Sequence, residues 1–166
     1  MVPRRPRLPL VIAFLAGCAA TKPPPSTPPI DIALKTATGA ITSLAELHGH
    51  PTLLLLFATY DATSQLAWGP LLMTREDFPS LQVLGIALEP NAERLLPLYG
   101  ESLGLTEMLT FEVEPAIVSG QSALGVVEGI PHYVLLDAEG RVLARRTGVT
   151  KASELREWLS EHLGPG

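Results

Sequence analysis

The chain has 166 residues, with 46% hydrophobic and 5% aromatic residues and with 12 Lys and Arg against 17 Asp and Glu. This length is enough for one domain with a sizeable core once a leader is removed. The charged residues are mostly acidic and form no basic stripe, which argues against a nucleic-acid partner.

Residues 1–17 have the form of a secretory signal peptide, with three arginines before the apolar run LPLVIAFLAG. That run is too short to span a bilayer as a permanent helix. Its end, together with the next residue, reads LAGC and resembles the lipobox of bacterial lipoproteins at all four positions. The resemblance implies cleavage before Cys18 and lipid on its sulfur. A general secretory signal with an incidental cysteine is the alternative.

Residues 18–30 form a proline-rich spacer between the expected lipid and the domain. Without the leader's three arginines, nine basic and 17 acidic residues remain, a net charge of about −8. We therefore expect the lipid alone to hold the protein on a membrane. An Asp directly after the lipidated cysteine resembles an inner-membrane retention signal. This chain has Ala19 at that position, which favours the outer membrane, with the domain in the periplasm.

The domain is expected over residues 31–164 and begins with alternating residues, a turn and a short helix LAEL that Ser43 can cap. The apolar run TLLLLFAT, residues 52–59, predicts a central strand that is buried on both faces. A helix is expected next, from Asp61 or Ser64 to Asp77.

The second half of the domain continues the alternation of strands and helices. Residues 81–88 predict another buried strand, Asn91 is a candidate helix cap, and residues 109–113 predict a short strand. GIPHYVLLDAEGRVLARRTG predicts a hairpin, and Ser153 is placed to cap an amphipathic last helix. These elements predict an α/β domain with a central mixed sheet flanked by helices.

This order of elements resembles the thioredoxin fold, and most closely the membrane-tethered thiol-disulfide proteins of the TlpA/ResA type. In that family the central strand ends in W-A-T-W and passes into C-x-x-C. Residues 57–60, Phe-Ala-Thr-Tyr, match the first motif by type, which puts Asp61 and Ser64 where the cysteines would stand. Pro70 lies one position later than the family's helix proline, so a correspondence shifted to Ala62 and Gln65 stays open.

The resemblance also implies that Pro131, in the motif GIP, forms a cis peptide bond and faces those two positions. An ordinary trans proline at the start of a strand is the alternative. Disulfide exchange needs a thiolate and a second thiol, so neither correspondence can support it, and we expect no catalytic residue, metal or other cofactor. Asp61 is expected to cap the helix and to carry the negative charge that a thiolate would have there.

Two other chemistries are conceivable from the residue types. His48 and His50 form an H-x-H pair, but solvated loop histidines are the simpler interpretation. Asp61, Ser64 and His132 are the residue types of a hydrolytic triad, although no nucleophile-elbow motif surrounds the serine. A weak hydrolase, or an oxidoreductase-family enzyme that works with a partner's thiols, therefore remains as an alternative function.

A binding role requires no thiol. In the thioredoxin fold, backbone groups beside the cis-proline can pair with an extended segment of a partner. Tyr60, Trp68 and Ile130 are candidate apolar contacts, and Trp68 is equally well explained as a core residue. We therefore expect a cell-envelope lipoprotein whose redox-inactive domain binds a protein or peptide at residues 60–64 and 129–132.

Overall fold

The computed structural model describes residues 27–105, 109–113 and 116–165. The signal peptide, Cys18 and most of the proline-rich spacer lie outside the described residues. The described part contains these helices and strands, in chain order: β1 (Ala33–Thr36), β2 (Ile41–Ser43), the 3-10 helix η1 (Leu44–Leu47), β3 (Thr52–Phe57), α1 (Ala62–Arg75), β4 (Gln82–Ala87), α2 (Ala92–Leu103), β5 (Leu109–Glu112), β6 (His132–Leu136), β7 (Val142–Thr147) and α3 (Ala152–Leu163).

The strands form one seven-stranded sheet in the order β2-β1-β5-β4-β3-β6-β7. Strands β3, β4 and β5 run parallel to one another, whereas β6 is antiparallel to both β3 and β7. The predicted mixed α/β sheet is therefore confirmed. In the register, Leu56 at the end of β3 pairs with His132 at the start of β6, which brings the two predicted site segments to one edge of the sheet.

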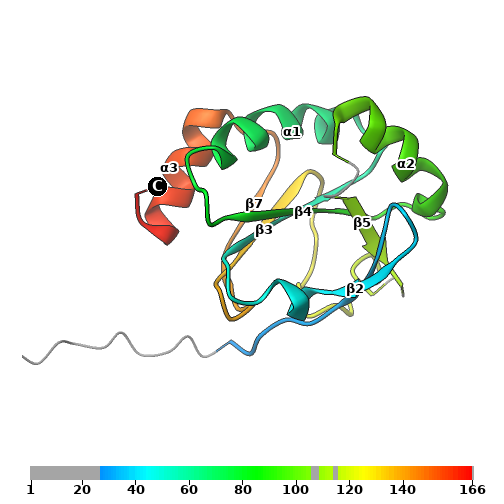
Figure 1. The fold of residues 1–166 in the computed structure, drawn as a ribbon, viewed down its shortest axis with the longest axis horizontal. Coiled ribbons are helices and arrows are strands. Elements are labelled where there is room, and N and C mark those ends of the chain that lie inside the picture. The colour runs from blue at the N-terminus through cyan, green and yellow to red at the C-terminus, as the bar shows by residue number, and fades with distance from the viewer. Residues whose placement is uncertain (1–26, 106–108, 114–115, 166) are drawn as a thin grey trace, which may run out of the picture.

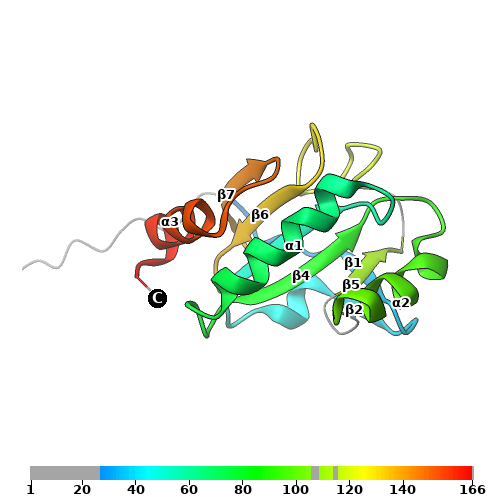
Figure 2. The ribbon, with the colours of Figure 1, turned by 90° about the horizontal axis from the view of Figure 1, so that it is seen from above.

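Three helices cover one face of the sheet, and η1 with irregular segments covers the other (Figures 1 and 2). Strand β3 is buried along its whole length, as the run of apolar residues predicts. Leu53, Leu55 and Phe57 pack toward the helices. Leu54 and Leu56 pack toward the opposite cluster, which includes Leu34, Leu44 and Ile117.

Three predicted helix caps were wrong in detail. Asn91 precedes α2, but its side chain makes no capping bond. Ser43 precedes η1, but its side chain makes no capping bond. Asp31 Oδ1 accepts a hydrogen bond from the Ala45 amide instead, at 3.1 Å. Ser153 lies inside α3, whose first turn is held by Glu154, since Glu154 Oε2 accepts from the Thr150 hydroxyl and the Lys151 amide. At the starts of η1 and α3, a side chain that is more distant in the sequence or longer than serine therefore accepts the hydrogen bond of the free backbone amide.

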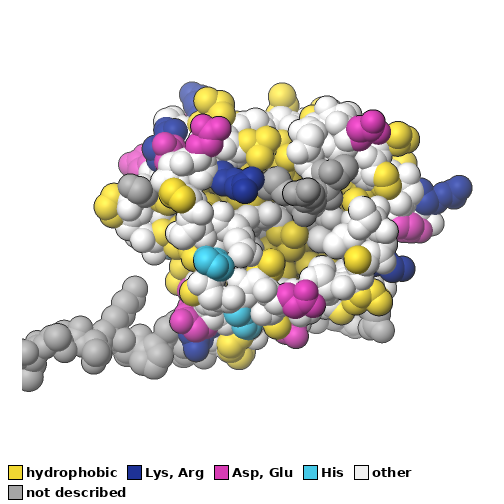
Figure 3. Space-filling view, viewed as in Figure 1, with side chains coloured by type: hydrophobic (Ala, Val, Ile, Leu, Met, Phe, Trp, Pro, Cys, Tyr) yellow, Lys and Arg dark blue, Asp and Glu magenta, His cyan; other side chains and the backbone are white. Residues whose placement is uncertain are grey.

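In the described part of the chain, no helix has the length and apolar character needed to cross a bilayer. Figure 3 shows one face of the molecule, on which Lys and Arg side chains are separated from one another rather than gathered into a stripe.

Candidate functional site

The candidate site lies where β3 passes into α1, beside the Ile130–Pro131 peptide bond. That bond is cis, as the resemblance implied. Tyr60, Gly129 and Ile130 line the same hollow of about 270 Å³, together with Ala58, Leu88, Ile117, Val118, Val127 and Glu128. We call this hollow the Pro131 groove.

Asp61 is the N-cap of α1, as predicted. Its Oδ2 accepts from the Ser64 amide at 2.6 Å and from the Thr63 hydroxyl at 2.5 Å. These hydrogen bonds stabilise the charged form and lower the pKa of the Asp61 carboxyl below its ordinary value of 3.8. The carboxylate thus places a negative charge at the positive end of the helix dipole.

Ser64 has a structural position inside the fold. Its side chain is fully buried, and its Oγ accepts a hydrogen bond from the Ala58 amide at 3.3 Å. This bond ties the first turn of α1 back to the end of β3. Gln65 makes a second link of this kind, because its amide nitrogen donates to the Thr59 carbonyl at 3.1 Å.

His132 follows the cis-proline and is 5% exposed. Its Nδ1 lies 2.7 Å from the Thr147 hydroxyl, and its Nε2 is buried without a hydrogen-bond partner in the described part. Burial, with the nearby positive charge of Arg145, lowers the pKa of the imidazole below 6.5. His132 is therefore a buried residue next to the cis-proline.

The three side chains of the conceivable hydrolytic triad do not form one. Asp61 bonds within its own helix turn, Ser64 bonds to Ala58, and His132 bonds to Thr147. Among the described residues, neither the Asp61 nor the Ser64 side chain is hydrogen-bonded to His132. The nucleophile-to-base contact that a hydrolase requires is missing from this arrangement.

Trp68 does not line the groove, and its alternative assignment to the core is correct. The indole is 2% exposed, and its Nε1 donates to the Tyr99 hydroxyl at 3.1 Å. Phe57 contacts both rings, edge-on to Trp68 and stacked on Tyr99. Tyr60, in contrast, is 77% exposed beside the groove, where an incoming segment can reach it.

The histidines of the H-x-H pair lie away from the groove. His48 lies against Gly140, in the turn between β6 and β7 at the other end of β6. Within residues 27–105, 109–113 and 116–165, no group of three or more His, Cys, Asp or Glu side chains is arranged to hold a metal ion.

Glu89 is a site residue that the sequence reasoning missed. It follows β4, and its Oε1 accepts from the Thr59 amide at 3.1 Å, so it connects the ends of β3 and β4. It is 8% exposed, and its Oε2 has no hydrogen-bond partner in the described part. Its position directly after a buried parallel strand was the available signal, because such positions meet at one edge of the sheet.

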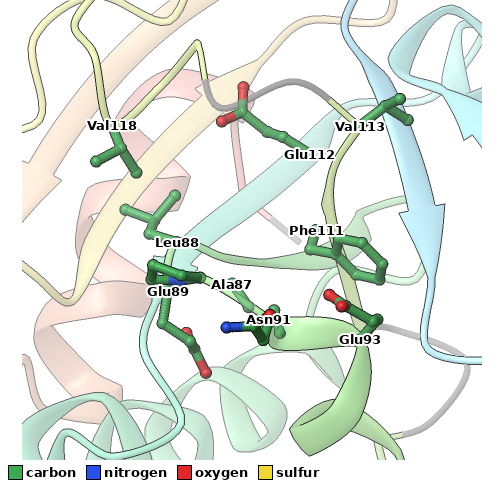
Figure 4. Close-up of a pocket in the computed structure, with 11 residues that line it drawn as sticks. Ala87, Leu88, Glu89, Asn91, Glu93, Phe111, Glu112, Val113 and Val118 are labelled. Carbon is green, nitrogen blue, oxygen red and sulfur yellow. The ribbon is translucent and has the colours of Figure 1, made fainter.

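A second hollow, of about 230 Å³, adjoins the Pro131 groove and shares Leu88 and Val118 with it. Figure 4 shows these two side chains next to each other, with Glu112 and Glu93 on either side of Phe111. Both oxygens of Glu112 accept from the Ile117 amide, and burial raises the pKa of its carboxyl. We call this second hollow the acidic hollow.

The fold is that of thioredoxin-like proteins, as solved structures show. A thiol:disulfide interchange protein from Chlorobium tepidum TLS is 20% identical with a TM-score of 0.67, over 83% of this chain and 97% of its own. StoA from Bacillus subtilis is 18% identical with a TM-score of 0.61, over 80% and 98%. A DsbF homologue from Corynebacterium diphtheriae is 18% identical with a TM-score of 0.67, over 81% and 85%. No family model and no curated protein matches the sequence.

Proposed function

We propose that this chain is a lipid-anchored protein of the bacterial cell envelope whose thioredoxin-like domain is redox-inactive and binds an extended segment of another protein in the Pro131 groove. The similar structures include proteins described as thiol:disulfide interchange proteins. This chain has one cysteine, Cys18, at the start of the proline-rich spacer, and so has no pair of thiols to form and resolve a mixed disulfide.

The observation that carries the proposal is the role of Asp61 and Ser64, the residues that the resemblance places at the cysteine positions. Asp61 and Ser64 are both used to hold the start of α1, whereas the cis-proline beside them is kept. The chain therefore retains the shape of the groove while its chemistry is gone. A fold that keeps only the groove is suited to binding rather than to thiol exchange.

Backbone groups at the groove are available to a partner. Pro131 accepts a hydrogen bond from the Gly148 amide, but the backbone amide and carbonyl of Ile130 make no hydrogen bond in the described part. Extended segments add to exposed backbone of this kind through main-chain hydrogen bonds. Tyr60, Val118 and Val127 supply apolar surface next to Ile130.

The anchor and the location are part of the proposal. The LAGC motif supports lipid on Cys18, and Ala19 after it supports the outer membrane with the domain in the periplasm. Several acyl carbons on one cysteine would hold the chain firmly, at about 0.8 kcal/mol per buried methylene.

Site-specific photocrosslinking in intact cell envelopes tests the groove. A photoreactive residue at Tyr60 is compared with one at Ile41, because these side chains are 77% and 72% exposed and Ile41 lies on β2, away from the groove. We expect one defined protein adduct from position 60, lost when Val118→Lys adds a positive charge to the groove, and none from position 41. Adducts from position 41 alone would refute the proposed docking surface.

A further inference from the structure

The Pro131 groove and the acidic hollow lie side by side, and we call the two together the depression. Leu88 and Val118 line both hollows. Val118 is 62% exposed at this junction, and Tyr60 is 77% exposed at the outer end. An extended segment that lies on the groove can therefore continue past Val118.

The charge of this depression is of one sign. Among the residues that the structure describes, its lining carries four carboxylates and no Lys or Arg. The carboxylates are Glu128 in the Pro131 groove and Glu89, Glu93 and Glu112 in the acidic hollow. Glu93 and Glu128 are exposed at its border. Opposite charges across an interface favour encounter and discriminate against partners of the wrong charge.

Glu89 independently indicates that the acidic hollow can accept a hydrogen-bond donor from a ligand. It lines the acidic hollow, is more than nine-tenths buried and makes one hydrogen bond through Oε1. A buried carboxylate oxygen without a partner is costly, and a cationic N–H donor in the hollow would remove that cost. An anionic ligand would increase it.

We infer that the segment bound here is basic as well as extended: an apolar side chain lies against Tyr60 and Val118, and a Lys or Arg a few residues away enters the acidic hollow. This inference rests on the proposed function and specifies its partner. A segment with Asp or Glu at that position would meet only like charges.

A display selection of random nonapeptides on the full-length chain with Cys18→Ser, which has neither lipid nor thiol, tests the charge separately from binding. We expect the selected peptides to combine apolar residues with Lys or Arg. The affinity of a selected peptide, measured by fluorescence anisotropy, should be about fourfold lower or more for Glu93→Gln/Glu128→Gln than for the unsubstituted chain. This loss of affinity should be smaller at high salt, which screens the charges. The matched control, Glu101→Gln/Glu157→Gln, removes two exposed carboxylates outside both hollows and should leave it unchanged.

The outcomes distinguish the basic character of the bound segment from peptide binding itself. Selected peptides that are apolar and uncharged, and that bind equally to both double variants, would overturn the inference and leave peptide binding intact. Acidic peptides, or no selected peptide, would also overturn it. The groove itself is tested independently by the crosslinking from position 60.

Discussion

Asp61 and Ser64 both hold the start of α1 through hydrogen bonds. Both were expected at the start of the helix, and Asp61 was predicted to be its cap. The structure adds that Ser64 is buried and bonded to the Ala58 amide. That contact depends on how the end of β3 and the first turn of α1 meet, so the local sequence could not reveal it.

The lowered pKa of Asp61 makes its contribution to stability dependent on pH. A carboxyl whose pKa is lower in the folded chain stabilises the fold above its unfolded value, here about 3.8, and loses that effect as the pH falls through the folded value. We expect Asp61→Asn to unfold at lower urea concentration than the wild type at pH 6. The difference should shrink as the pH falls below 4.

Urea titrations of both chains at several pH values measure this effect. Because Asn also caps helices, the substitution isolates the charge from the capping bond. A difference between the two chains that stays constant from pH 6 to pH 3 would show that the charge of Asp61 does not stabilise the helix.

Among the elements, β4 and α1 meet at an unusually close contact. A Cβ atom on Gly85 of β4 would lie 2.7 Å from Trp68 Cη2, 2.8 Å from its Cζ2 and 3.0 Å from a Leu109 methyl carbon. Glycine inside a strand marks such close approach, so the sequence carried a signal. The sequence did not show that Trp68 was the neighbour, which is why its place in the core was left open.

Gly85→Ala is expected to lower the free energy of unfolding by about 1–3 kcal/mol, the usual cost of an overpacked core. The loss should be smaller when Trp68→Phe is also present, because phenylalanine lacks the Cη2 and Cζ2 atoms that the new methyl group meets. Chemical denaturation of the two single variants and the double variant gives this coupling. Additive losses would place the clash elsewhere.

The other elements were predictable to different degrees. The apolar run of residues 52–59 and the turn at 137–140 have strong local signals, and β3 and the β6–β7 hairpin occur where they were expected. The caps at Ser43 and Ser153 failed because Asp31 and Glu154 satisfy the free amides. Which side chain accepts the hydrogen bond from these amides depends on distances in the folded chain, which the local sequence pattern does not contain.

At the scale of the whole molecule, the chain enters the domain at the end opposite to the groove. The Ile30 amide donates to the Gly140 carbonyl, in the turn between β6 and β7, whereas Pro131 precedes the other end of β6. A domain tethered through residues 18–26 would therefore direct the Pro131 groove away from the membrane. With the proposed lipid anchor on Cys18, the groove would then face a partner in the periplasm rather than one in the same membrane.

The acidic hollow could not have been found from the sequence. Its lining comes from three separate segments, residues 87–93, 111–113 and the loop around Val118. Only the sheet order, with β5 next to β4, brings these segments together. The Pro131 groove was foreseeable because the resemblance brings together the segments 60–64 and 129–132. Nothing in the sequence linked Glu93 to Glu112.

An insulin-reduction assay with dithiothreitol tests the central claim most directly. The wild-type chain, solubilised with its lipid, is compared with Asp61→Cys/Ser64→Cys, which restores a thiol pair at the start of α1 next to the cis-proline. We predict that the wild type reduces insulin no faster than dithiothreitol alone, and that the double variant accelerates the reaction. Thiol-dependent turnover by the wild-type chain would contradict a redox-inactive domain.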